Sequence, residues 1–194
     1  MSMFTDKLVE RAKKEFADYQ GQFENAGELK QRIGTYWTFL HRPDLDGGDD
    51  IAWSAAFISY MVNLAGAGAQ FPYSAQHSVY FYRTINDLLT RRSAPFLGYR
   101  VGAVEVRPGD IIGMNRGDAP LIDYDWASHH ADYKSHADIV VDVGDDGAIR
   151  TLGGNVGQAP GQIAGKTFSM QEGNLVNQAN DDQQVFVVIR SFLP

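Results

Sequence analysis

The chain has 194 residues, of which 44% are hydrophobic and 21% are charged, and these values are typical of one globular domain with a sizeable core. Its formal net charge of −7 argues against a nucleic-acid-binding protein, which usually carries a basic patch, and against binding to anionic membrane surfaces. Because the chain contains no cysteine, disulfides and thiolate metal sites are excluded.

The N-terminal segment MSMFTDKLVERAKKEF has no apolar run after its charged residues, so it lacks the pattern of a secretory signal peptide. No stretch approaches the roughly 18 consecutive apolar residues that indicate a membrane-spanning helix. These features predict a protein that is synthesised in the cytoplasm and either stays there or leaves by a route without a signal peptide.

Apolar residues at helical spacing predict four helices in the first half of the chain, over residues 5–19, 25–40, 51–65 and 75–91. Asn25 and Ser74 are the expected N-caps of the second and fourth helices. The third helix is apolar on nearly all sides, so we expect it to be buried.

Beyond residue 96 the pattern changes to short apolar runs that are typical of strands. We expect strands in YRVGAVEV, IIGM, HADIVVDV, AIRTLGG and QQVFVVIRSF, with a turn at GDDG that joins the third and fourth into a hairpin. Helices that come first and strands that follow predict an α+β fold with a mainly antiparallel sheet, in a single domain over residues 1–194.

Four short pieces occur in an order that suggests an activated nucleophile. AWSAAF places Ser54 at the start of the buried helix, RPGDII marks a turn before a strand, SHADIVV opens a strand with His136, and LGGN places Asn155 after the next strand. A hydroxyl becomes an effective nucleophile when a base accepts its proton and a third group holds that base. We therefore predict a catalytic triad of Ser54, His136 and Asn155.

The order of these pieces resembles that of the papain-like cell-wall hydrolases of bacteria, the NlpC-type and CHAP-type amidases and peptidases. The resemblance covers roughly residues 45–192 and implies a papain-like core over 45–194, with 1–44 as a helical N-terminal extension. It also implies hydrolysis of amide or peptide bonds, with bacterial peptidoglycan or a peptide-like substrate as the partner and with no cofactor.

Two features depart from the pattern of these families. Their nucleophile is a cysteine, whereas the matching residue here is Ser54, and serine holds its proton far more tightly than cysteine. No amide side chain precedes this position to stabilise an oxyanion, since the residues upstream are Gly47, Gly48, Asp49 and Asp50. Ser54 is therefore either a working nucleophile, a relic in a non-catalytic binding protein, or a replacement for a catalytic cysteine.

Aromatic and histidine residues near the predicted triad are candidates for substrate binding. The segment DAPLIDYDWASHHADYK, residues 118–134, directly precedes His136, and we expect it to cover the substrate as a flap. His77 lies near the start of the fourth helix, either as a capping-region residue or as a second polar group beside Ser54. The candidate substrate-binding residues are Trp53, His77, Tyr124, Trp126 and His130.

Two patterns resemble metal sites only in composition. His129, His130, His136 and Asp138 are residue types that bind zinc, but the helical HExxH spacing is absent. DLDGGDD has the acidic residues of a calcium loop without the full spacing of one. We therefore expect no metal.

A cell-wall hydrolase without a signal peptide would need a dedicated secretion system. We hypothesise that the protein is exported as an antibacterial effector to the periplasm of a target cell. Its partners would then include a secretion-system carrier and an immunity protein, and neither nucleic acid nor a membrane is expected among them.

Overall fold

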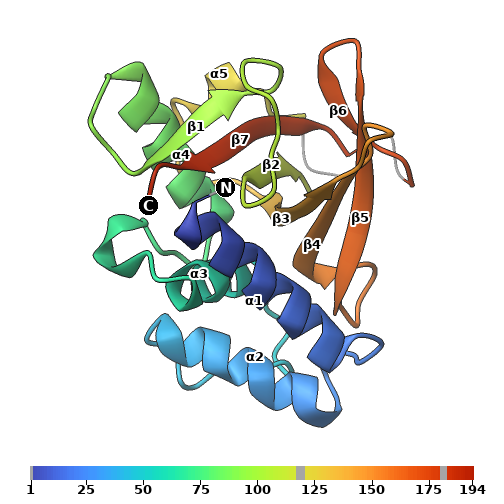
Figure 1. Ribbon diagram of the computed structural model, residues 1–194. Helices are drawn as coiled ribbons and strands as arrows, with labels where there is room; N and C mark the ends of the chain where they lie inside the picture. The colour runs from blue at the N-terminus through green and yellow to red at the C-terminus, as the bar shows by residue number, and fades with distance from the viewer. Residues whose placement is uncertain (1, 117–120, 180–182) are drawn as a thin grey trace.

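The computed structural model describes residues 2–116, 121–179 and 183–194 (Figure 1). The helices are α1 (Met3–Tyr19), α2 (Gly27–Phe39), α3 (Ser54–Leu64), α4 (His77–Leu89) and the short α5 (Tyr124–Ala127), with a 3₁₀ turn at Gly68–Gln70. The strands are β1 (Phe96–Arg100), β2 (Ile111–Asn115), β3 (Ser135–Val143), β4 (Ile149–Val156), β5 (Gln162–Gln171), β6 (Asn174–Asn177) and β7 (Val185–Ser191). The four predicted helices and the predicted change to strands are confirmed.

The first two helices are joined by a buried ionic contact. Ser2 caps α1, because its hydroxyl accepts a hydrogen bond from the backbone N–H of Thr5. Further along α1, the buried carboxylate of Glu15 accepts hydrogen bonds from Arg32 and Tyr36 of α2. This contact fixes α2 beside α1 and satisfies a charge that would otherwise be costly to bury.

The predicted starts of two helices are two residues early. Asn25 does not cap α2; the side chain of Gln22 instead accepts a hydrogen bond from the backbone N–H of Leu29. Ser74 does not cap α4; its hydroxyl accepts from the N–H of Gln76, and the helix begins one residue later. In both cases a polar side chain accepts a hydrogen bond from a backbone N–H, but the pair of residues differs from the predicted cap.

Within the described residues, seven strands form one antiparallel sheet in the order β1-β7-β2-β3-β4-β5-β6. β3 and β4 form the predicted hairpin, with Val143 opposite Ile149. β5 and β6 were not predicted, because they bury only isolated apolar residues such as Ile163 and Phe168 between polar ones. The α+β class and the antiparallel sheet are confirmed.

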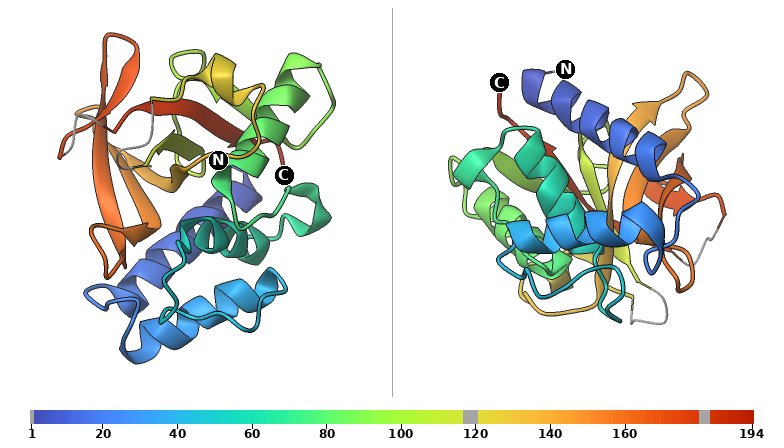
Figure 2. Two further views of the ribbon diagram at one scale, coloured as in Figure 1. Left: turned by 180° about the vertical axis from the view of Figure 1, so that it is seen from behind. Right: turned by 90° about the horizontal axis from the view of Figure 1, so that it is seen from below.

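The sheet is curled, and the helices pack against one of its faces while the other face encloses a second core (Figures 1 and 2). Successive residues of a strand point to opposite faces. Accordingly, Ile111 packs with the helices, whereas Ile112 belongs to the core inside the curl. Helix α3 approaches the sheet closely at Gly154 of β4, where a Cβ would lie 2.5 Å from the Trp53 ring and 2.7 Å from Phe57. This close approach sets the position of the start of α3.

The segment 1–44, which the sequence suggested as an extension, contributes to the same core as the rest of the chain. Leu8 of α1 and Leu29 of α2 are fully buried in one cluster with Phe57 of α3. Among the helices of the described residues, none combines the length and apolar character that crossing a bilayer requires.

Candidate active site

Ser54 is the first residue of α3, and it is 2% exposed. No side chain caps this helix, because the N-cap residue Trp53 is directed into the core, where its indole N–H bonds to Glu24. The first N–H groups of a helix have no partners within the helix and carry a positive partial charge. Ser54 therefore lies where negative charge on its oxygen would be stabilised.

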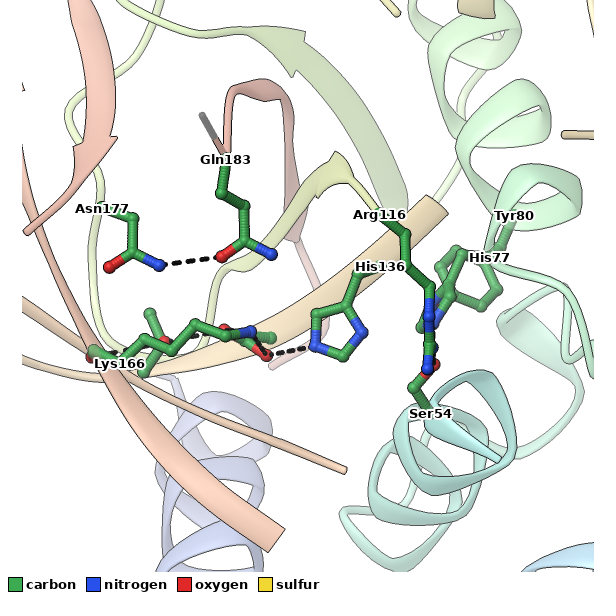
Figure 3. A network of polar contacts seen from close by, with 10 residues as sticks. Ser54, His77, Tyr80, Arg116, His136, Lys166, Asn177 and Gln183 are labelled. Carbon is green, nitrogen blue, oxygen red and sulfur yellow. Dashed lines mark hydrogen bonds and ion pairs between the residues drawn. The ribbon is translucent and has the colours of Figure 1, made fainter. Parts of the chain in front are cut away.

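The hydroxyl of Ser54 contacts a histidine and an arginine, and Figure 3 shows both side chains beside it. Its Oγ is 2.7 Å from Nε2 of His77, the first residue of α4, and 3.1 Å from Nη1 of Arg116, which directly follows β2. The other ring nitrogen of His77, Nδ1, is hydrogen-bonded to the hydroxyl of Tyr80, one turn along the same helix. Four side chains from three segments thus form one continuous row of hydrogen bonds.

The chemistry of these side chains makes the row suitable for proton transfer. Arginine can only donate, so Ser54 Oγ accepts from Arg116 and its own proton stays available for Nε2 of His77. In the tautomer with the ring proton on Nδ1, that N–H donates a hydrogen bond to the Tyr80 hydroxyl. Nε2 then carries no proton and can accept one. Burial lowers the pKa of His77 well below its usual value, and His136 and Arg116 lower it further. His77 is therefore neutral at neutral pH, which is the form that accepts a proton.

A second polar cluster is buried behind His77. The ring centroids of His77 and His136 are 5.7 Å apart, and Nε2 of His136 lies 3.0 Å from Oδ1 of Asp138. The other carboxylate oxygen, Oδ2, accepts hydrogen bonds from Thr151 at 3.0 Å and from Nζ of Lys166 at 2.9 Å. Because the carboxylate accepts at Nε2, the neutral ring of His136 carries its proton there and leaves Nδ1 unprotonated.

The charges of this cluster balance one another. Burial alone would raise the pKa of Asp138, but Lys166 and the hydrogen bond from His136 outweigh it and hold that pKa well below its usual range. Burial, together with Lys166, lowers the pKa of His136 to about 4 despite the opposing effect of Asp138. Gly153 of β4 provides the space for the pair, since a Cβ there would overlap Oδ1 of Asp138.

A pocket of about 630 Å³ opens in front of Ser54, a volume that suits a small-molecule or peptide substrate. Tyr133 and Ser135, which line it, have buried hydroxyl groups with no hydrogen-bond partner among the described residues. The residues that line the pocket are Asp50, Ala52, Ser54, Ala55, Ala75, Gln76, His77, Arg116, Asp132, Tyr133, Lys134 and Ser135. Ser54, His77 and Arg116 therefore line one pocket.

Comparison with known families places the chain in a bacterial group. Residues 25–162 match the family described as uncharacterized proteins conserved in bacteria (DUF2272). The chain belongs to this family. The match includes Ser54, His77, Arg116 and the His136–Asp138 pair, whereas Lys166 lies beyond it. No curated protein and no solved structure matches the chain.

The structure brings Ser54 and His136 into one region but gives Asn155 a different role. The hydrogen-bond partner of Ser54 is His77, and the partner that orients His136 is Asp138 rather than Asn155. Asn155 has a φ of 56° where the pairing of β4 with β5 shifts in register. Asparagine tolerates this left-handed conformation, so the residue serves to bend the strand. Two predicted roles are therefore corrected: His77 and not His136 is the histidine bonded to Ser54, and Asn155 does not orient His136.

Of the predicted substrate-binding residues, His77 lines the pocket, whereas Trp53 and Tyr124 belong to the core. The Tyr124 hydroxyl donates a hydrogen bond to the carbonyl of Gly98 in β1, which holds α5 on the sheet. Their assignment to substrate binding is therefore wrong, because both aromatic rings are used in packing.

The flap predicted over residues 118–134 is only partly described, since 118–120 lie outside the described residues. Trp126 and His130 stack on each other with ring centroids 3.8 Å apart, and neither lines the pocket in front of Ser54. Ala131 accepts a hydrogen bond from Ser78 of α4, so this part of the segment packs beside that helix. Of the described residues 121–134, only 132–134 line the pocket.

Three residues of the site were not assigned a role from the sequence, Tyr80, Arg116 and Lys166, and Asp138 was considered only as a zinc ligand. The spacing of His77 and Tyr80 on a helix, and of His136 and Asp138 on a strand, are local signals that could have identified two of them. Among the described residues, no group of three or more histidine, aspartate or glutamate side chains is placed to hold a metal ion.

Proposed function

We propose that the protein is a hydrolase of amide or peptide bonds in which Ser54 is the nucleophile and His77 is the general base. The observation that carries this proposal is the hydrogen bond of 2.7 Å between Ser54 Oγ and the ring of a buried, neutral histidine at the wall of a pocket. A nucleophile within hydrogen-bond reach of its base, and a base held by a third group, is the arrangement that serine hydrolases require. Tyr80 is the third group here.

In the first half of the proposed reaction, Ser54 Oγ attacks the substrate carbonyl carbon while its proton passes to Nε2 of His77. The carbonyl oxygen becomes an oxyanion, which Arg116 and the free N–H groups at the start of α3 stabilise. The carbon–nitrogen bond then breaks, and His77 returns the proton to the leaving amine. In the second half, water gives a proton to His77 and releases the acyl group, and His77 returns that proton to Ser54.

The charges of the buried cluster act on this reaction in opposite directions, since His136 and Lys166 disfavour a protonated His77. Proton transfer leaves a positive charge on His77, close to the positive charge of Arg116. The carboxylate of Asp138 favours the protonated form of His77, as its effect on the pKa of that residue shows. His136 lies between the two groups and packs against the ring of His77. We assign His136, Asp138 and Lys166 to the positioning of His77.

The substrate and the fold relationship follow from the sequence resemblance. A serine at the start of a buried helix that packs on an antiparallel sheet is consistent with a papain-like core, and we propose this relationship. Bacterial peptidoglycan, or a peptide of similar chemistry, is accordingly the substrate that we propose.

A second candidate function is a non-catalytic binding protein on the same fold. The observation that favours it is that Ser54 is 2% exposed and that Arg116 contacts its Oγ directly. An acyl substrate must displace this contact in part before it reaches the nucleophile. Binding of wall fragments without cleavage would favour this candidate.

Incubation with isolated peptidoglycan and with synthetic peptides, followed by mass analysis of the products, distinguishes the two functions. Hydrolysis should be abolished to a similar extent in Ser54→Ala and His77→Gln, because the members of a catalytic unit act together. Ser93→Ala, an exposed serine away from the pocket, is the matched control. Cleavage that survives both substitutions would place the chemistry elsewhere.

A further inference from the structure

A second hollow lies beside the pocket that contains Ser54. Its volume is about 420 Å³, and the two cavities share Ala75 as a lining residue. The second hollow is lined by Phe39, Leu40, His41, Asn63, Gly68, Ala69, Tyr73, Ser74 and Ala75. The lining residues carry no carboxylate, lysine or arginine, in contrast to the charged wall of the first pocket.

One polar group in this hollow has no partner. The hydroxyl of Tyr73 is buried and makes no hydrogen bond within the described residues. Burial raises the pKa of Tyr73 to about 12, so the group stays protonated and can donate. The ring is held edge-on by Phe39, with centroids 5.0 Å apart, and by Phe71 at 5.4 Å. A buried donor without an acceptor is costly, and a ligand that supplies an acceptor removes that cost.

The segment that separates the two cavities is anchored to α3. The hydroxyl of Ser59 donates to the carbonyl of Ser74 at 2.9 Å, and it accepts from the N–H of the same residue at 3.2 Å. Ser59 is fully buried and lies on the same helix as Ser54. The position of the second hollow relative to the nucleophile is therefore fixed before any substrate binds, as a specificity site requires.

We propose that this hollow is a specificity subsite that receives a large uncharged apolar side chain of an extended, peptide-like substrate, with Tyr73 donating to a substrate carbonyl. The inference rests on the proposed function, because the subsite is defined by its place beside the pocket that contains Ser54. Three observations support it: Ala75 lines both cavities, the lining of the hollow carries no carboxylate, lysine or arginine, and the Tyr73 hydroxyl has no partner among the described residues. The protein therefore selects the residue next to the bond that it cleaves.

Binding to the Ser54→Ala variant tests the subsite without relying on turnover. The ligands are two pairs of blocked peptides, one pair for each side of the central amide, and the two peptides of a pair differ only in phenylalanine or glycine next to that amide. For one of the two pairs, the phenylalanine peptide should bind at least about tenfold more tightly, the size of effect that a filled apolar pocket provides. Ala75→Leu in the same background adds bulk at the exposed residue that lines both cavities. It should bring the ratio of the two peptides' dissociation constants close to one.

Tyr73→Phe is the matched variant for the hydroxyl, since it removes one buried atom without a partner and should not destabilise the fold. It should weaken binding of the phenylalanine peptide by about three- to tenfold, which corresponds to one hydrogen bond. Equal binding of phenylalanine and glycine peptides in both pairs, or a ratio that Ala75→Leu does not change, would overturn the subsite. Selective binding together with an absence of hydrolysis by the unmodified protein would instead refute the catalytic proposal alone.

Discussion

Mild acidification is predicted to destabilise the fold through its two buried histidines. His136 has a pKa lowered to about 4 by burial, compared with 6.5 for an unperturbed histidine. Below pH 6.5 the unfolded chain therefore binds a proton that the folded chain does not. Stability is unaffected above pH 6.5, falls as the pH decreases towards 4, and then levels off. Burial also lowers the pKa of His77, so this residue adds to the loss of stability at low pH.

The size of the effect follows from the pKa difference. Between pH 7.5 and pH 5.0, His136 alone should reduce the free energy of unfolding by about 2 kcal/mol, since each pH unit below 6.5 costs about 1.4 kcal/mol. Asp138 does not contribute in this range. Its pKa is lowered on folding from a model value of 3.8, so its stabilisation is lost only when the pH falls below that value.

Urea unfolding followed by tryptophan fluorescence at pH 7.5, 6.5, 5.5 and 5.0 measures the effect. His136→Gln is the matched control, because the glutamine amide can still donate to Asp138 and does not titrate. In this variant, the free energy of unfolding should lose the part of its pH dependence that comes from protonation of one histidine. Equal free energies of unfolding at pH 7.5 and 5.0, or an unchanged pH dependence in His136→Gln, would refute the burial argument.

Three further substitutions test individual parts of the site. Gly153→Ala should destabilise the protein strongly, as measured by thermal unfolding, because the new Cβ overlaps Asp138; an unchanged melting temperature would contradict the close packing. Asp138→Asn should cost about 3–5 kcal/mol in urea unfolding, because it leaves Lys166 buried without its counter-charge, and Lys166→Met should restore part of that loss. Arg116→Met should lower kcat by about 10²-fold with little change in KM, and an unaltered kcat would remove Arg116 from oxyanion stabilisation.

The order of elements could be predicted because it depends on local patterns. The apolar spacing of Leu29 and Ile33 determines a helix regardless of what packs on it, and the apolar run from Ile139 to Val141 determines a strand. β5 gave no such signal, since its buried residues are separated by polar ones on a strand of which only part is covered. Its position in the sheet comes from pairing with β4, which no local pattern encodes.

The site was predicted only where one residue type in one position carries the chemistry. Ser54 at the start of a buried helix is such a case. His136 was predicted as the base that contacts Ser54, but that contact is made by His77, and His136 bonds to Asp138 instead. Arg116 lies 62 residues from Ser54 along the chain, and Lys166 lies 28 residues from Asp138, so their contacts depend on the tertiary fold. The group that orients His136 is Asp138 and not the predicted Asn155. The reason is local, because Asp138 lies on the same strand face as His136.

The most direct test of the central claim is covalent labelling of Ser54 with a fluorophosphonate probe, followed by peptide mapping. We expect one adduct on Ser54 that is absent in Ser54→Ala and forms at least about 10²-fold more slowly in His77→Gln, since the base must accept the serine proton. His136→Gln should still form the adduct, at a reduced rate. An adduct that forms equally fast without His77, or no adduct on Ser54 in the unmodified protein, would contradict the assignment of this pair as nucleophile and base.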